Sequence, residues 1–98
     1  MQIQAYHAGT SERGLIGFDF IGDLTEAQKA ALPKYVGWSG KGGKRITLKS
    51  DKVNEGVNET GIKKIKAILK VLNGDYEYKA WASNAHATME EACAVHDI

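Results

Sequence analysis

The residues with the most evident chemical potential lie in a glycine-rich stretch, residues 37–45. It combines four glycines with Trp38, Ser39 and three cations within nine residues. Because glycine permits backbone N–H groups to converge on an anion, and an indole can stack on a base, this composition indicates a site for a nucleotide or another phosphorylated small molecule. The alternative is a plain helix-to-strand connection in which Trp38 folds onto the core.

The spacing in this stretch excludes two familiar catalytic loops. A Walker phosphate-binding loop ending at Lys44 requires a glycine where Trp38 stands and a hydroxyl side chain where Arg45 stands. A nucleophile elbow around Ser39 requires a second glycine where Lys41 stands. ATPase and α/β-hydrolase chemistry are therefore not expected.

Two short stretches resemble motifs of known families. Residues 37–42, Gly-Trp-Ser-Gly-Lys-Gly, resemble the Gly-Trp-Asn-Gly-Lys-Gly turn of a family of small phage proteins that sequester nucleotide signals of bacterial defence. This likeness implies a sequestering protein that holds a nucleotide. Residues 6–11, Tyr-His-Ala-Gly-Thr-Ser, resemble the strand-borne His-Gly-Thr with which ADP-ribosyltransferases hold NAD, although Ala8 interrupts it. That likeness implies a small NAD-using transferase acting through His7, and its alternative is a strand end that runs into a turn.

The charges are separated along the chain rather than mixed. Residues 34–70 carry ten basic and three acidic side chains, whereas the rest of the chain carries three basic and nine acidic ones. The formal net charge of +1 therefore conceals a dipolar molecule. On the helix expected over residues 59–73, Lys63, Lys66 and Lys70 fall within about 60° of one another and form a row of ammonium groups.

A basic surface of this kind suits a polyanion. Its cations can track a phosphodiester backbone and release counterions at each contact. Because lysine outnumbers arginine, we expect nonspecific contacts with phosphate or carboxylate groups rather than bidentate reading of bases. The alternative is a solvated face that keeps a small domain soluble. The residues expected to contact the partner are Lys34, Trp38, Lys41, Lys44, Arg45, Lys49, Lys63, Lys66 and Lys70.

These observations favour a small non-enzymatic binding or inhibitor protein. The expected partner is nucleic acid, a nucleoprotein or an acidic protein surface, engaged through the basic segment 34–70, as in a phage-type inhibitor of host machinery such as a defence complex. At 98 residues the chain leaves little room for a deep active-site cleft. No carboxylate pair and no Cys/His spacing compels a catalytic role, so neither catalytic residues nor a cofactor is expected.

One stripe near the C-terminus carries side chains that can bind metals. Its members are His86, Glu90, Cys93 and Asp97. The ends of the stripe lie about 15 Å apart on a helix, so at most two neighbours can share an ion, and we expect no metal site. Cys93 is the only cysteine and has acidic rather than cationic neighbours, so we expect an inert, buried or half-buried thiol.

The hydrophobic pattern predicts the elements that position these residues. Residues 2–7 alternate with period two and predict a strand that ends at residues 8–10, and residues 15–21 are apolar on both faces, as in a central strand that forms a hairpin with the first. A helix over residues 59–73 follows from apolar side chains at helical spacing, and Asn73 with Gly74 ends it. The other expected elements are a helix over residues 26–32 with a capping box of Thr25 and Gln28, a strand over 44–49, a polar loop over 50–58, a strand over 76–82 and a helix over 84–96 capped by Asn84.

This order, β-β-α-β-α-β-α, predicts one small α+β domain over residues 1–98, with about four mostly antiparallel strands and two to three helices packed against the sheet. The apolar runs are far shorter than the ~18 to 20 residues that cross a bilayer, so we expect no membrane partner. The first residues lack the basic and apolar regions of a secretory signal, which favours a cytoplasmic location.

Overall fold

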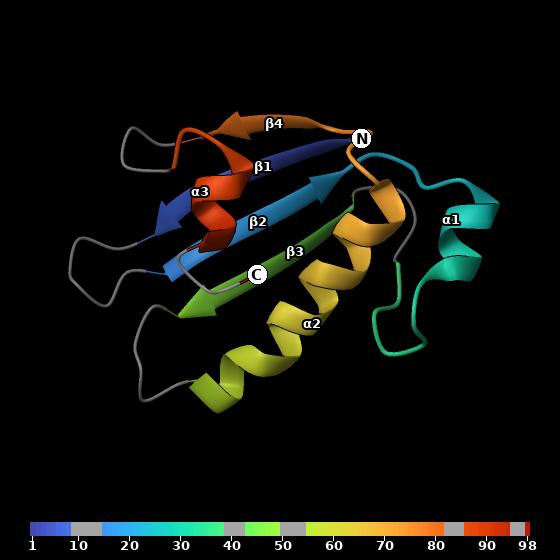
Figure 1. The fold of residues 1–98 in the computed structure, drawn as a ribbon, viewed down its shortest axis with the longest axis horizontal. Coiled ribbons are helices and arrows are strands. Elements are labelled where there is room, and N and C mark those ends of the chain that lie inside the picture. Colours follow the sequence, from blue (N-terminus) through green and yellow to red (C-terminus); the bar gives the residue numbers. More distant parts are fainter. Residues whose placement is uncertain (9–14, 39–42, 50–54, 82–85, 95–97) are drawn as a thin grey trace.

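The structure is a computed structural model that describes residues 1–8, 15–38, 43–49, 55–81, 86–94 and 98. Seven elements follow one another along these residues (Figure 1). They are β1 (Gln2–Ala8), β2 (Leu15–Ile21), α1 (Glu26–Ala31), β3 (Lys44–Lys49), α2 (Glu55–Leu72), β4 (Glu77–Ala80) and α3 (Met89–Ala94). The predicted order and the α+β class are both confirmed.

The strands form one mixed sheet in the order β3-β2-β1-β4. β1 and β2 pair antiparallel, with Ala5 opposite Phe18, and β2 and β3 pair antiparallel, with Phe18 opposite Ile46. β4 is shorter than the predicted 76–82 and lies parallel to β1, with Ala80 beside Ala5. The predicted hairpin and the predominance of antiparallel pairs are confirmed, and α2 is the crossover that carries the chain from one edge of the sheet to the other.

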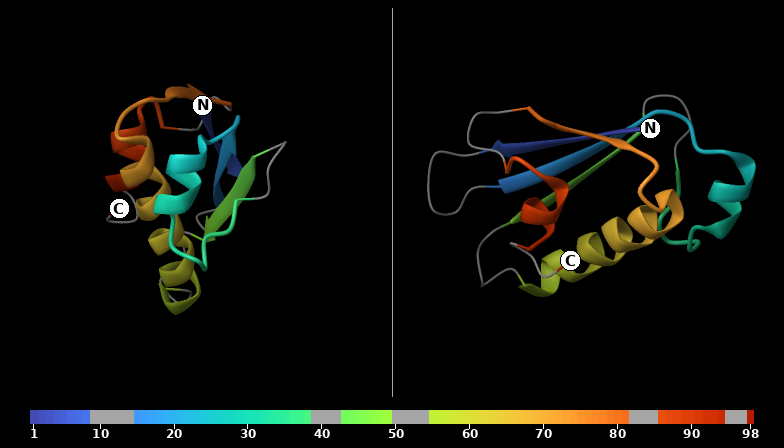
Figure 2. Two further views of the ribbon diagram at one scale, coloured as in Figure 1. Left: turned by 90° about the vertical axis from the view of Figure 1, so that its right-hand side faces the viewer. Right: turned by 45° about the horizontal axis from the view of Figure 1, so that its top comes forward.

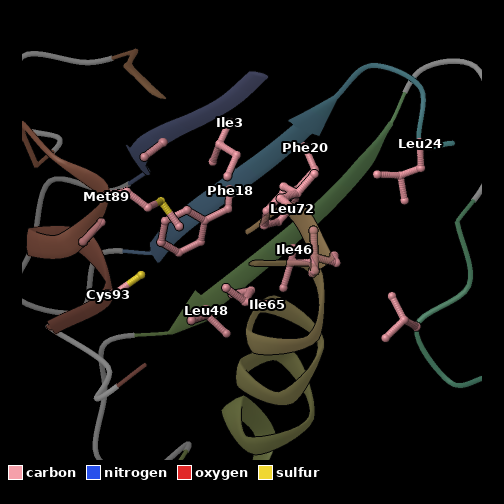
Figure 3. Packing of buried hydrophobic residues seen from close by; sticks show 14 residues of the cluster. Ile3, Phe18, Phe20, Leu24, Ile46, Leu48, Ile65, Leu72, Met89 and Cys93 are labelled. Carbon is pink, nitrogen blue, oxygen red and sulfur yellow. The ribbon is translucent and has the colours of Figure 1, made fainter. Parts of the chain in front are cut away.

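The core lies between the sheet and two helices. Alternate residues of β1, β2 and β3 face it, so the buried set along these strands has period two. α2 covers this face with a stripe of buried side chains, and α3 adds a further apolar turn (Figure 3). The buried residues are Ile3, Ala5, Phe18, Phe20, Leu24, Val36, Ile46, Leu48, Ile65, Ile68, Leu72, Met89, Ala92 and Cys93, and the expected burial of the thiol is thereby confirmed.

The described helices cover one face of the sheet and leave the other open. α2 and α3 lie on the same side, as the turned views show (Figure 2). On the opposite face Asp19 of β2 pairs with Arg45 of β3, and Ile21 is 38% exposed. The predicted central position of β2 is confirmed, but its second face is not covered, so the apolar pattern of residues 15–21 overstated its burial.

α1 lies beyond the end of the sheet and contributes no buried residue of its own (Figure 1). The predicted capping box is present, because the Gln28 N–H donates to Thr25 Oγ1 (3.1 Å) and the Thr25 N–H donates to Gln28 Oε1 (2.9 Å). The helix stops where Leu32 becomes extended ahead of Pro33. Its two ends are therefore defined by local sequence, and buried side chains before and after it attach the segment to the core.

α2 begins one turn earlier than the pattern predicts, at Glu55 rather than at residue 59. Residues 50–58 have weak helix propensity, which predicts a loop, but a strongly amphipathic helix extends cooperatively into such a segment. The predicted end is confirmed, because Asn73 (φ 49°) and Gly74 (φ 83°) are both left-handed. In the described part of the chain, no helix is long and apolar enough to cross a bilayer.

α3 is shorter than predicted and begins later. Asn84, the expected cap, lies outside the described residues, and the helix instead starts after Thr88. The Glu91 N–H donates to Thr88 Oγ1 (3.2 Å), so threonine caps the helix. The hydroxyl of Tyr78 donates to the His86 carbonyl (2.5 Å), and this contact holds the segment before the helix against β4.

Candidate functional site

Trp38 is packed rather than presented to solvent. Its ring meets Phe20 edge to face, with centroids 6.5 Å apart and planes at 71°, and lies against the hydrophobic core. The buried Nε1 has no hydrogen-bond acceptor among the described residues. The ring therefore packs onto the core, as expected if this stretch is a plain connection between a helix and a strand. Residues 39–42, including Lys41, lie outside the described part of the chain.

The Lys44 ammonium group donates hydrogen bonds to backbone carbonyl groups of the protein itself. Its Nζ donates to the Val36 carbonyl and to the Gly37 carbonyl (2.7 Å), which ties the start of β3 to the segment behind α1. Burial lowers the pKa of Lys44, and the nearby charge of Lys64 lowers it further. This ammonium group therefore links the start of β3 to the backbone of Val36 and Gly37.

Arg45 lies on the opposite face of the sheet from Lys44, because neighbours along a strand alternate. Its Nε and Nη2 donate to the Asp19 carboxylate at 2.7 and 3.1 Å, a bidentate pair between residues opposite in register. The Arg45 side chain is 67% exposed and that of Asp19 is 19% exposed. Lys49 is the last residue of β3, and its side chain lies outside the described part. Lys44 and Arg45, the basic residues of this stretch whose side chains the structure describes, therefore face opposite sides of the sheet.

Three lysines of α2 share an exposed surface. Lys63, Lys66 and Lys70, named here the α2 lysine ridge, are all exposed, whereas the apolar residues of the helix face the core. Lys63 pairs with Glu59 (3.5 Å). In the described part of the chain, no carboxylate pairs with Lys66 or Lys70. The fold therefore exposes these three lysines together on one side of α2.

A groove runs between α1 and α2 beside the ridge. Its walls are mostly small apolar side chains, and Lys70 is among its lining residues. Pro33 lines it too, and the exposed Lys34 follows directly in sequence. The lining residues are Ala27, Gln28, Ala31, Pro33, Ala67, Lys70 and Val71.

Among the described residues, Tyr35 and Trp81 are exposed aromatic side chains that the sequence pattern left unmarked. Trp81, directly after β4, is 70% exposed. It lines a hollow of about 470 Å³ with Gln4, Asp19 and Arg45 on the open face of the sheet. Alternation could have found it, because Tyr78 packs against the core and residues three positions apart on a strand face opposite sides.

The structure describes only part of each of the two stretches that resemble known families. No family model, curated protein or solved structure matches the chain. The likeness to nucleotide-sequestering phage proteins rests on residues 37–42, of which Gly37 and Trp38 are described, and Trp38 is packed. The likeness to ADP-ribosyltransferases rests on residues 6–11, of which the structure describes the strand backbone up to residue 8. Both functions stay predictions.

Weakly acidic groups gather where α3 meets β4. Burial raises the pKa values of Tyr76, Tyr78 and the Cys93 thiol. The carboxylates of Glu90 and Glu91 add to this, the former acting on Tyr76 and Cys93 and the latter on Tyr78. These groups remain neutral in the fold at ordinary pH. Among the described residues, no three His, Cys, Asp or Glu side chains come together as a metal site.

We expect the protein to lose stability under alkaline conditions. Folding raises these pKa values above their usual 9.0 for the thiol and 10.0 for the tyrosines, so the unfolded chain releases the protons first. The stabilisation is complete below the usual values and is lost as pH rises through the folded-state values. Thermal melts should show a Tm that falls above about pH 9. Tyr78→Phe should flatten the fall, because it removes one of the groups whose pKa is raised. A constant Tm up to about pH 11 would contradict the burial of these groups.

Proposed function

We propose that this protein is a non-enzymatic binding protein that engages nucleic acid through the α2 lysine ridge. The observation that supports it is that three ammonium groups share one exposed helix face, two of them without a carboxylate partner in the described chain. A surface that served solubility alone would more often intersperse acids among these lysines. Here the acid that pairs with the ridge is Glu59, at one end of it.

The spacing of the ridge suits a phosphate backbone. Lys63 and Lys70 lie about 10 Å apart along the helix axis, at ~1.5 Å per residue. One strand of B-DNA presents a phosphate about every 3.4 Å along its axis, so the ridge covers roughly three phosphates. The exposed Lys34, which directly follows Pro33 of the groove, is the fourth lysine expected to contact the backbone. Lysine ammonium groups contact phosphates as point charges, so binding should not depend on base sequence.

The glycine-rich stretch offers less support for nucleic-acid binding than the ridge does. Lys44 and Trp38, two of its expected contact residues, are engaged within the fold. Arg45 faces the other side of the sheet and pairs with Asp19. A protein that occupies nucleic acid without converting it acts as a competitor or inhibitor of the machinery that uses the same nucleic acid.

The salt dependence of affinity tests the proposal. With three to four lysine contacts, the slope of log affinity against log salt should be about −3 to −4 for duplex DNA. The double variant Lys66→Gln/Lys70→Gln should reduce the slope to about −1 to −2 and lower affinity at about 50 mM salt at least tenfold. Fluorescence anisotropy of a labelled random-sequence duplex measures both quantities.

Lys29→Gln/Lys79→Gln is the matched control for the duplex experiment. It removes the same number of charges, one from Lys29 of α1, which already pairs with Glu26 (3.7 Å), and one from Lys79 of β4, which lies on the face of the sheet opposite to α2. This variant should leave the slope unchanged, and equal effects of the two double variants would reject the ridge as the contact surface. If neither duplex nor single strands bind at low salt, nucleic acid is rejected and an acidic protein surface becomes the partner to test.

A further inference from the structure

A row of side chains crosses the open face of the sheet. Taken in register from β3 to β4, the row is Arg45, Asp19, Gln4 and Lys79. Trp81 follows Lys79 by two residues and shares its face. α2 and α3 lie on the other side of the sheet (Figure 2), so this row and the α2 lysine ridge face in opposite directions.

Trp81 is unusual for its exposure. Tryptophan is among the most buried residue types on average, and Trp38 follows that rule by packing on Phe20. Trp81 instead leaves a large apolar ring in water, beside a hollow whose other walls are the polar side chains of Gln4, Asp19 and Arg45. A ligand that fits this surface needs a flat apolar face and a hydrogen-bonding edge.

The polar walls of the hollow are fixed and nearly neutral. The bidentate pair of Arg45 and Asp19 cancels its own charge. The Gln4 Nε2 donates to Gln2 Oε1 (2.7 Å), which orients the amide and leaves its oxygen as an acceptor and its second N–H as a donor. One donor beside one acceptor matches the edge of a nucleobase. Neither a free anion nor a free cation is favoured at such a surface.

We propose that this face binds an unpaired base of single-stranded nucleic acid, with Trp81 as the stacking surface and Gln4 as the contact to the base edge. Aromatic side chains on an exposed sheet stack on any base and so accept varied sequences. The site is an open face that holds one base weakly, and a strand adds a neighbouring phosphate for Lys79. Duplex DNA cannot use it, because its bases are paired and stacked within the helix. This inference goes beyond the phosphate contacts of the ridge.

Intrinsic fluorescence tests the site. In a Trp38→Phe variant, Trp81 is the one tryptophan left. A single-stranded oligomer of about 12 nucleotides should quench its emission, whereas an abasic oligomer of equal length should not. Trp81→Ala should weaken affinity for the strand about 5- to 100-fold, the effect of losing a stacked base, and should leave affinity for duplex DNA unchanged.

Three variants separate stacking from other effects. Tyr35→Ala removes another exposed ring, 54% accessible and in the segment after α1, and should leave affinity unchanged. Trp81→Tyr should restore most of the binding, because a smaller ring still stacks. Lys66→Gln/Lys70→Gln should weaken duplex binding but preserve the quench, so failure of the ridge and failure of this site are distinguishable. The proposal is overturned if the strand leaves Trp81 emission unchanged, if the abasic oligomer quenches equally, or if the two alanine variants weaken binding alike.

Discussion

Gly43→Ala is expected to lower the free energy of unfolding by at least about 3 kcal/mol. Gly43 has a φ of 78°, a left-handed conformation that costs alanine ~1 to 2 kcal/mol. An added Cβ would also lie 1.8 Å from the carbonyl oxygen of Phe20 and 2.8 Å from its carbon. Because these are backbone atoms, the start of β3 would have to move away from β2. The pairing of Phe20 with Lys44 and the tie from Lys44 to Gly37 would then weaken.

Urea denaturation measures this loss, and Gly74→Ala is its matched control. Gly74 also has a left-handed φ, 83°, but an added Cβ would meet no atom within 4 Å. This variant should therefore cost only the conformational strain, ~1 to 2 kcal/mol. The difference between the two variants isolates the close approach of residue 43 to β2, and equal losses would contradict that approach.

Local sequence predicted the elements whose determinants lie close together in the chain. The first strand follows from alternation and the second from an apolar run, and the cap at Thr25 depends on a side chain three residues away. The start of α3 could not be predicted in this way, because Asn84 and Thr88 are both good caps. The contact from Tyr78 to His86 holds the residue ahead of Thr88 against β4, and a separate strand supplies it. Local sequence does not predict the strand order either, because packing between distant segments determines it.

The candidate site was predictable only where its residues share one element. Helical spacing alone places the three lysines of the ridge together. Lys44 and Arg45 are neighbours in sequence but face opposite sides of the sheet, so a charge count along the segment does not show which cations share a surface. The difference between Trp38 and Trp81 depends on what packs against each ring. Phe20 contacts the first, and the second is left exposed, which only the assembled fold reveals.

Phe18→Ala is expected to lower the free energy of unfolding by about 3 to 5 kcal/mol, the cost of truncating a fully buried phenylalanine. Phe18 has no exposed surface and lies between Ala5 and Ile46 of the neighbouring strands. Its ring extends from the sheet toward Met89 of α3 (Figure 3), so truncation opens a cavity between two elements that are not adjacent in sequence. A domain of this size has only about 5 to 15 kcal/mol of stability, so the variant would be close to unfolding.

Ile21→Ala on the same strand is the control, and it also tests whether the second face of the sheet is free. Ile21 points away from the core and is partly exposed, so its truncation should cost less than about 1 kcal/mol. Both losses are measured by the midpoint of urea denaturation at an unchanged m-value. If Ile21→Ala costs nearly as much as Phe18→Ala, another chain or segment covers this face in solution, and Trp81 is not available to a base. A small loss from Ile21→Ala beside a large one from Phe18→Ala shows, without any ligand, that the sheet is packed on one side and open on the other.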